Sequence, residues 1–243
     1  MLILAIESSG EICGIALVQN GELVSLRQRR HRMDLLSGLT AEIGEALRAH
    51  SIQPSDLDAI AVSLGPGSFT GLRIGIATAK TLAYTLGKPI VGIPTLDVLA
   101  RDAARVRAEA SLIAAVTSSR PDEFYIAVYR ASDGDVERLT DYVSVAKAEI
   151  GSIYPVMNQQ VFICGPGASS AREGFQAAGA EPVLCGAPLS SPNPWTLAIL
   201  GEERLSRGEW DDPVALVPLY VRRPTPEVRL DLRLKPQASN EAG

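Results

Sequence analysis

Aromatic residues are scarce in this 243-residue chain. Phe, Trp and Tyr together make up 5% of it, whereas hydrophobic residues make up 46%. The core must therefore consist mostly of aliphatic side chains and alanine, which suits helices packed on a sheet of Val, Ile and Leu. The length exceeds that of one minimal domain and is about right for two compact lobes.

Cysteine is also rare, and its distribution excludes two classes of small scaffold. Cys13, Cys164 and Cys185 are widely spaced, and no C-x-x-C pair occurs. An odd count with such spacing argues against a disulfide framework and against a structural zinc site. Cys13 and Cys164 lie in apolar, strand-like segments, so we expect both to pack as small hydrophobic side chains.

The chain lacks long runs of basic or apolar residues. Its formal net charge is −5, whereas a protein that binds RNA by itself usually shows a basic patch. The apolar opening, residues 1–6, lacks the basic region of a signal peptide, and no apolar run approaches the ~20 residues of a membrane helix. We therefore expect a cytoplasmic protein with no membrane contact and no nucleic-acid binding of its own.

Residues for catalysis are equally sparse. The two histidines, His31 and His50, lie on either side of one expected helix, and neither has a second histidine at i+4. The paired-imidazole geometry of a metal hydrolase is therefore not available, and no G-x-S-x-G nucleophile motif occurs. We expect no catalytic residue and no metal site in this chain.

The order of expected elements is the same in the two halves of the chain. In the first half we expect strands over 2–7, 13–19, 22–29, 59–64 and 90–93, and helices over 33–50, 69–86 and 94–107. In the second half we expect strands over 111–116, 123–130, 135–140 and 160–164, and helices over 144–150, 168–178 and 193–207. Each half thus reads as three strands followed by an αβα unit, which predicts a duplicated α/β architecture.

The repetition predicts a division into lobes. We expect an N-terminal lobe over residues 1–108, which docks a partner, and a smaller C-terminal lobe over residues 109–223. The remaining tail, residues 224–243, is charged and interrupted by proline, a composition typical of disorder.

Two Gly-Pro-Gly turns each follow an expected strand and precede a helix. A strand that ends in such a turn can hold an anion with free backbone N–H groups. A phosphate-transferring enzyme also needs a carboxylate after the first strand, and Glu7 stands there, although we favour a structural carboxylate held by hydrogen bonds over a magnesium-binding role. The candidate residues of this vestigial nucleotide site are Glu7, Ser8, Gly65, Gly67, Gly165 and Gly167.

The helix after the first turn carries Gly71, Gly75 and Ala79 at four-residue spacing. Such a stripe presents a flat face to which another backbone can come close, either in the core or at a partner. We interpret it as a docking surface together with the apolar stripe of the preceding helix. We expect Gly75→Glu to abolish partner binding in a folded chain, because an unpaired charge at an interface core is costly. The candidate interface residues are Leu35, Leu36, Leu39, Ile43, Gly71, Leu72, Arg73, Gly75, Ile76, Ala79 and Lys80.

Several segments resemble those of one bacterial family. Gly65-Pro66-Gly67-Ser68-Phe69-Thr70-Gly71-Leu72-Arg73-Ile74-Gly75, continuing into Ala77-Thr78-Ala79-Lys80, is similar to the signature of the TsaB (YeaZ) family. Residues 3–9 resemble the opening strand of that family, with Glu-Ser where Asp-Thr is usual, and residues 218–222 resemble its C-terminal P-x-Y-x-R motif. The resemblance covers about residues 1–225.

Two further segments match the family less closely. Residues 30–36 resemble its R-x-H-S-x-x-L-L-P element, with Arg32 and Ser37 in place of the usual Ser and Pro. The stretch Thr117-Ser118-Ser119-Arg120 stands where the family often has Asp-Ala-Arg, and only Arg120 fits. These departures affect the detail of partner fit rather than the general role.

The resemblance implies an α/β fold of the two-lobed actin-like type, which is shared by acetate and sugar kinases, Hsp70 and actin. It also implies a non-catalytic scaffold subunit in the formation of N6-threonylcarbamoyladenosine at position 37 of tRNAs that read ANN codons. The implied partners are the catalytic paralogue TsaD, which carries an H-x-x-x-H metal motif, and the ATPase TsaE. Homodimer formation through the N-terminal lobe is also implied, with tRNA met only as part of the complex.

Other functions remain open at this point. No cofactor is expected on the isolated chain, although a nucleotide at a partner interface is compatible with the family. An ATP-dependent phosphotransferase that uses Glu7 and the glycine turns is one alternative. A glycoprotease-like peptidase and a stand-alone tRNA-binding module are the others, and the missing metal pair and the acidic charge argue against them.

Overall fold

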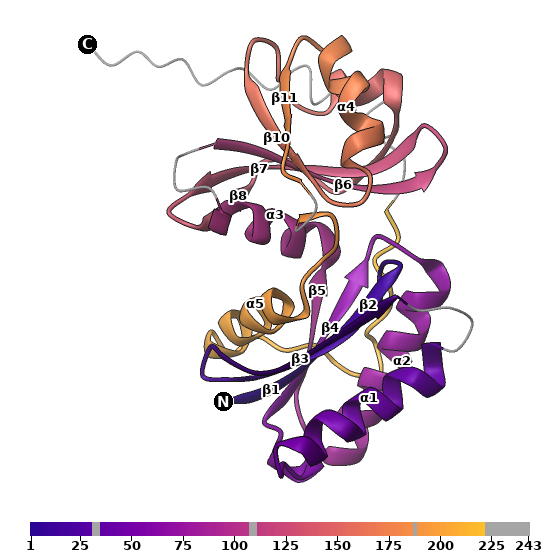
Figure 1. Ribbon diagram of the computed structural model, residues 1–243, viewed down its shortest axis with the longest axis vertical. Helices are drawn as coiled ribbons and strands as arrows, with labels where there is room; N and C mark the ends of the chain where they lie inside the picture. Colours follow the sequence, from indigo (N-terminus) through magenta and orange to yellow (C-terminus); the bar gives the residue numbers. More distant parts are fainter. Residues whose placement is uncertain (31–34, 107–110, 187–188, 222–243) are drawn as a thin grey trace.

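The computed structural model describes residues 1–30, 35–106, 111–186 and 189–221, which form two lobes, each built on a mixed sheet (Figure 1). The first sheet has the order β3-β2-β1-β4-β5, in which β1 to β3 are antiparallel and β4 and β5 run parallel to β1. Its strands are β1 (Leu2–Glu7), β2 (Ile12–Gln19), β3 (Glu22–Arg30), β4 (Ala59–Gly65) and β5 (Ile90–Pro94).

The second sheet has the order β11-β10-β6-β7-β8, which repeats the first when read from β8 to β11. Strand β9 also pairs with β7. Again β6 and β7 pair antiparallel, whereas β10 runs parallel to β6 and β11 runs parallel to β10. The strands are β6 (Ser111–Arg120), β7 (Glu123–Ser132), β8 (Asp135–Arg138), β9 (Val143–Ala146), β10 (Gln160–Cys164) and β11 (Glu181–Leu184). The predicted duplicated unit and the two-lobed actin-like fold are therefore confirmed.

Helices cover both faces of each sheet, and one helix of each half packs on the sheet of the other half. On the first sheet, α1 (Leu35–Ala49) and α2 (Phe69–Leu86) cover one face, and α5 (Pro194–Ser206), from the second half of the chain, covers the other. On the second sheet, α4 (Ala168–Ala177) and the 3-10 helix η2 (Lys147–Ser152) cover one face. Its other face packs against α3 (Thr95–Val106), from the first half. A short 3-10 helix, η1 (Pro54–Asp56), precedes β4.

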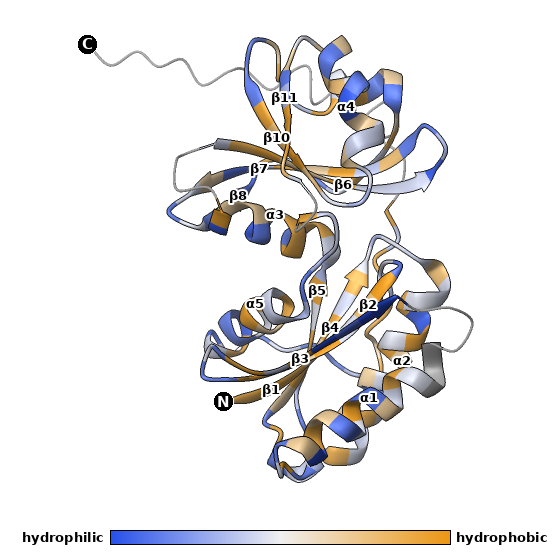
Figure 2. Cartoon of the chain, in the orientation of Figure 1, coloured by the Kyte–Doolittle hydropathy of each residue, from blue (hydrophilic) through white to orange (hydrophobic). Residues whose placement is uncertain are grey.

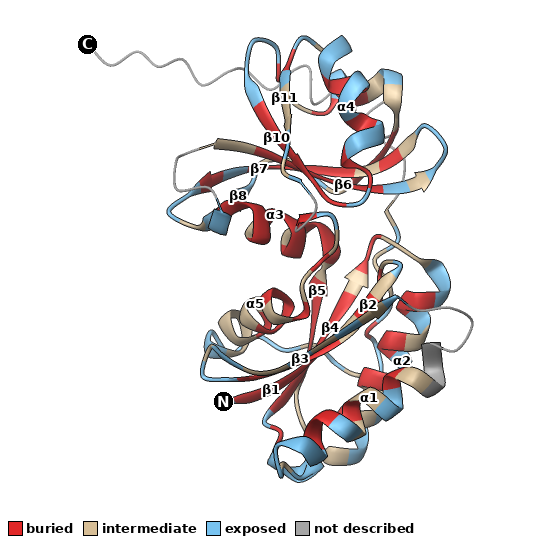
Figure 3. Cartoon of the chain, viewed as in Figure 1, coloured by how far each residue is buried: buried red, intermediate tan, exposed pale blue. Residues whose placement is uncertain are grey.

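The central strands are apolar because they are covered on both faces (Figures 2 and 3). All six residues of β1 are buried, as are the first five of β4. At the start of α2 the Ser68 hydroxyl accepts a hydrogen bond from the Gly71 N–H (3.2 Å), and Gly87 ends the helix at φ +62°. The strand–turn–helix unit thus forms as the sequence predicts.

Two local expectations need correction. Residues 144–150, expected to be a helix, form most of β9 followed by η2, because Val143 and Val145 are β-branched, buried and paired with β7. Strand β11 was not anticipated, since it has four residues with Pro182 among them and lies at the sheet edge.

Helix α3 ties the lobes together through polar contacts. Its Asp97 accepts hydrogen bonds from the Tyr129 and Tyr142 hydroxyls of the second lobe. Its Asp102 accepts from the Thr196 hydroxyl of α5 (2.5 Å) and from the Asn193 N–H (3.3 Å). The division at residue 108 stays a prediction. Helices α3 and α5 both pack against the sheet of the opposite half of the chain.

A C-terminal strap, residues 209–221, runs back over the first lobe. The Asp211 N–H donates to the Ile90 carbonyl (2.8 Å), and the Leu219 N–H donates to the Leu64 carbonyl (2.9 Å). Leu216 is buried in the core beneath α2. The strap therefore covers the outer edge of β5 and reaches the end of β4 beside the first glycine turn.

Candidate functional site

The first Gly-Pro-Gly turn presses against the residues that follow β1, and the second presses against the middle of β6. The Ser68 N–H donates to the Ser9 carbonyl (2.6 Å), and the Gly167 N–H donates to the Val116 carbonyl (3.1 Å). A Cβ at Gly67 would lie 2.2 Å from the Ser9 carbonyl oxygen, and a Cβ at Gly165 would lie 2.4 Å from that of Val116. Glycine is needed in both turns for this approach.

The two turns flank a cleft between the lobes with a volume of about 660 Å³. Seven Ser and Thr side chains line it, among them Ser9, Ser68, Thr95 and Thr117. Of the predicted nucleotide-site residues, Gly67 lines the cleft, while Gly65 and Gly165 are buried beside it, with φ near +95°. Thr95 and Thr117 were missed by sequence reasoning, because a single threonine at a strand end carries no recognisable signal.

Glu7, the candidate phosphate-site carboxylate, is completely buried behind Ser9. One carboxylate oxygen accepts hydrogen bonds from the Ser9 N–H (2.6 Å) and hydroxyl (2.5 Å), and the other has no partner. Burial raises the pKa of Glu7 to about 7, from an ordinary value of 4.5. A buried carboxylate that holds a proton near neutral pH favours the structural interpretation over a magnesium-binding role.

Metal chemistry also finds no support in the described residues. No group of three or more His, Cys, Asp and Glu side chains is placed there to hold a metal ion. His31 lies outside that part of the chain, and His50 is exposed at the end of α1.

The small-residue stripe of α2 faces the sheet of its own lobe. Gly71, Gly75 and Ala79 are buried. A Cβ at Gly71 would lie 2.2 Å from the Ser8 carbonyl oxygen, and one at Gly75 would lie 2.0 Å from the Ser8 hydroxyl oxygen. The flat face thus lets α2 approach the end of β1. The expectation that Gly75→Glu leaves the chain folded is wrong, because no space exists there for a side chain.

The other candidate interface residues are mostly internal too. Four apolar ones, from α1 and α2, are buried in the first lobe: Leu39, Ile43, Leu72 and Ile76. The Lys80 ammonium donates to the Val214 and Leu216 carbonyls of the strap, both at 3.0 Å. Arg73 is exposed, and the side chains of Leu35 and Leu36 lie outside the described part of the structure.

The surface that α2 does present is its opposite side, which we call the outer face of α2. Phe69 and Tyr84 are 59% and 79% exposed near its two ends, and the Arg73 guanidinium lies over the Phe69 ring at 3.7 Å. Between the aromatic residues the helix carries small side chains. The outer face comprises Phe69, Thr70, Arg73, Ala77, Thr81 and Tyr84. The four-residue spacing of this outer face is visible in the sequence. It does not identify the exposed side of the helix, because the inner glycine stripe has the same spacing.

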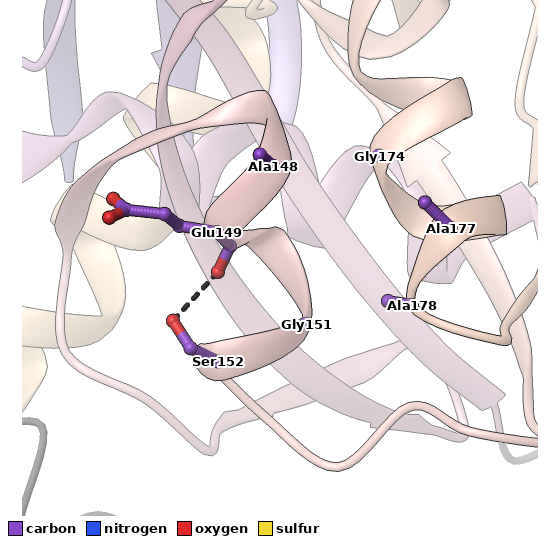
Figure 4. A pocket seen from close by; sticks show the side chains of 7 residues that line it. All are labelled: Ala148, Glu149, Gly151, Ser152, Gly174, Ala177 and Ala178. Atoms are coloured by element: carbon purple, nitrogen blue, oxygen red, sulfur yellow. Dashed lines mark hydrogen bonds between the residues drawn. The ribbon is translucent and has the colours of Figure 1, made fainter.

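A second cavity, of about 370 Å³, lies between η2 and α4 of the second lobe (Figure 4). It is lined by small residues such as Ala148, Gly174 and Ala177, and the Glu149 side chain points away from α4. A Cβ at Gly174 would lie 2.6 Å from the Lys147 carbonyl oxygen, so glycine is needed for close packing here. This cavity therefore results from the close packing of η2 and α4, and the small residues that line it do not indicate a catalytic or binding site.

Within the described ranges, no helix combines the length and the apolar character needed to cross a membrane.

Comparisons with known proteins give consistent similarities. Residues 28–227 match the family described as "TsaD: tRNA N6-adenosine threonylcarbamoyltransferase". The chain is 30% identical over 227 residues to the "tRNA threonylcarbamoyladenosine biosynthesis protein TsaB" of Bacillus subtilis, which covers 91% of this chain and 94% of the relative. It is 33% identical over 153 residues to the protein of the same name from Escherichia coli, covering 62% and 64% of the two chains.

A solved structure agrees with the sequence relatives. The structure of YeaZ from Pseudomonas aeruginosa superposes with a TM-score of 0.79 and 26% identity, over 90% of this chain and 99% of that one. The similarity therefore extends through both lobes.

Proposed function

Since the chain belongs to the TsaB family of tRNA threonylcarbamoyladenosine biosynthesis proteins, we propose that it is the scaffold subunit that binds and activates the catalytic subunit TsaD. Its role lies in the biosynthesis of threonylcarbamoyladenosine in tRNA. We assign the chemistry of transfer, at position 37 of tRNAs reading ANN codons, to TsaD rather than to this chain. The subunit would act in the cytoplasm and meet tRNA only within the assembled complex.

The observation that supports this proposal best is the outer face of α2. Two large aromatic side chains, Phe69 and Tyr84, are exposed on one helix face and flank small residues. Exposed aromatic groups and arginine are enriched in protein interfaces, where they supply much of the binding energy. Arg73, stacked on Phe69, adds a cation that can pair with an acidic group of the partner. We propose this face, rather than the buried glycine stripe, as the docking surface.

The same face can serve a second copy of this chain or TsaD, but not both at once. We therefore propose that homodimer and heterodimer compete, and that addition of TsaD dissociates the homodimer. TsaE is then expected to join the TsaB–TsaD pair rather than the isolated chain.

A matched pair of substitutions tests the docking surface. Ala77→Glu places a charge in the middle of the outer face of α2, and Ala177→Glu places the same charge at the exposed C-terminal end of α4 in the other lobe, beside the open cavity next to η2. Both residues are exposed, so both variants should fold with far-UV circular dichroism spectra like that of the wild type. We expect Ala77→Glu to lose co-elution with TsaD in size-exclusion chromatography and Ala177→Glu to retain it. Retained co-elution of a folded Ala77→Glu variant would overturn the placement.

A further inference from the structure

The cleft between the lobes contains two buried hydroxyl groups that no protein group satisfies. Thr95 and Thr117 line it from opposite lobes and are 1% and 4% exposed. The Oγ1 atom of each has no hydrogen-bond partner. A buried polar atom without a partner costs free energy, so two at one cavity require an explanation.

The cleft is also the place where four helices begin. Ser68 is the N-cap of α2, and Thr95 is the first residue of α3. Pro166 and Pro192, which also line the cleft, stand two residues before α4 and α5. Each helix start carries N–H groups that have no partner within the helix, together with the positive end of the helix dipole. The combined field of four helix starts favours a negatively charged group.

The charged residues that line the cleft are one acidic and one basic residue. Glu11 is the acidic side chain among the residues lining the cleft, and it pairs with Arg30 at 3.7 Å. A neighbouring cavity of about 350 Å³ shares Arg30 and Ser191 with the cleft. The cleft thus opens toward a side that carries Arg30.

We propose that the cleft between the lobes binds a small organic anion with a phosphate or carboxylate group. The anionic group accepts hydrogen bonds from the Thr95 and Thr117 hydroxyls, and the helix starts around it add the favourable field. The cleft volume of about 660 Å³ falls within the range of small-molecule sites, so an organic body can accompany the charged group. The remaining Ser hydroxyls of the wall can bond to polar groups on that body. This site is separate from the outer face of α2 and does not rest on the scaffold function.

Isothermal titration calorimetry of the full chain tests the proposal, with ribose 5-phosphate, citrate and inorganic phosphate as probes and ribose as the uncharged control. We expect saturable binding of at least one organic anion and none of ribose. A preference between ribose 5-phosphate and citrate identifies phosphate or carboxylate as the bound group.

Variants at the two threonines locate the site. Thr95→Val and Thr117→Val remove the hydroxyl at nearly constant volume, and each should weaken binding about tenfold or more, because a hydrogen bond to a charged group is lost. Neither should unfold the chain, since the hydroxyls have no partner within the protein. Thr95→Ser retains the hydroxyl and should retain binding, and Thr81→Val, on the outer face of α2, should bind as the wild type does.

Two results would overturn the proposal: no saturable binding of any anion at millimolar concentration, or wild-type affinity in both Thr→Val variants. Neither result affects co-elution with TsaD, so failure of this proposal can be distinguished from failure of the docking surface.

Discussion

The buried carboxylate of Glu7 makes the stability of the protein depend on pH in a direction that can be measured. In the unfolded chain its pKa has the ordinary value of 4.5, and in the fold burial raises the pKa to about 7. Between these values the folded protein retains a proton that the unfolded chain has released. The contribution of Glu7 to stability is therefore most favourable at low pH, falls as pH rises through this window, and is constant above it.

The size of the effect follows from the two pKa values. A tenfold difference in proton affinity corresponds to about 1.4 kcal/mol, so the window from 4.5 to about 7 corresponds to about 3 kcal/mol. Glu7→Gln removes the titration while keeping an oxygen that can accept the two hydrogen bonds from Ser9. Relative to the wild type, the variant should therefore gain about 3 kcal/mol in free energy of unfolding as the pH rises through the window.

Urea denaturation of both proteins at a series of pH values measures this difference. Glu11→Gln is the matched control, because it makes the same substitution at a side chain that is 82% exposed in the adjacent loop rather than buried. A difference between Glu7→Gln and wild type that does not vary with pH would refute the reasoning. It would mean that Glu7 ionises in the fold as it does in the unfolded chain, and a cation-binding role would then regain support.

Two further perturbations test the packing around α2. Gly75→Ala should lower the free energy of unfolding by about 1–3 kcal/mol in urea denaturation, because its Cβ would lie 2.0 Å from the Ser8 hydroxyl oxygen. Gly44→Ala on α1 is the control, because the atom nearest to its Cβ is an Arg48 side-chain nitrogen at 4.0 Å. This substitution should raise the free energy of unfolding by up to about 1 kcal/mol. An equal effect of the two Gly→Ala substitutions would contradict the close approach of α2 to β1. Lys80→Met should release the strap by removing both hydrogen bonds to its carbonyls, so amides near Leu216 should exchange faster in hydrogen-exchange measurements while those of β1 do not. Unchanged exchange at the strap would show that the buried Leu216 side chain holds it alone.

Most of the architecture could be predicted from neighbouring residues. The apolar run of β4, the turn at Gly65 and the helix that follows are encoded within one segment, and the structure contains them as expected. The repetition of that order in the second half predicted the duplicated sheets. Residues 144–150 were misjudged because Val143 and Val145 pair with β7, and that pairing is not visible in a local pattern.

The site could be predicted only in part. The sequence identified α2 and both glycine turns as the informative elements, and its resemblance to the TsaB family indicated the part in tRNA threonylcarbamoyladenosine biosynthesis that the relatives bear out. Which side of α2 faces outward could not be predicted, because the inner stripe at Gly71 and Gly75 and the outer one at Arg73 and Ala77 have the same spacing. Long-range packing decides between them, since Ser8 occupies the space beside Gly71 and Gly75 and leaves room for glycine alone.

The sequence by itself determined most of the elements, their order, the duplicated fold and the family, because each depends on residues that are neighbours along the chain; β9 and β11 are the exceptions. Tertiary structure alone decided that α3 and α5 pack on opposite lobes and that Glu7 lies buried behind Ser9. It also decided that Thr95 and Thr117 meet at one cleft with unsatisfied hydroxyls. These features depend on contacts between residues far apart in the chain, and burial and hydrogen bonding are properties of those contacts rather than of any local segment.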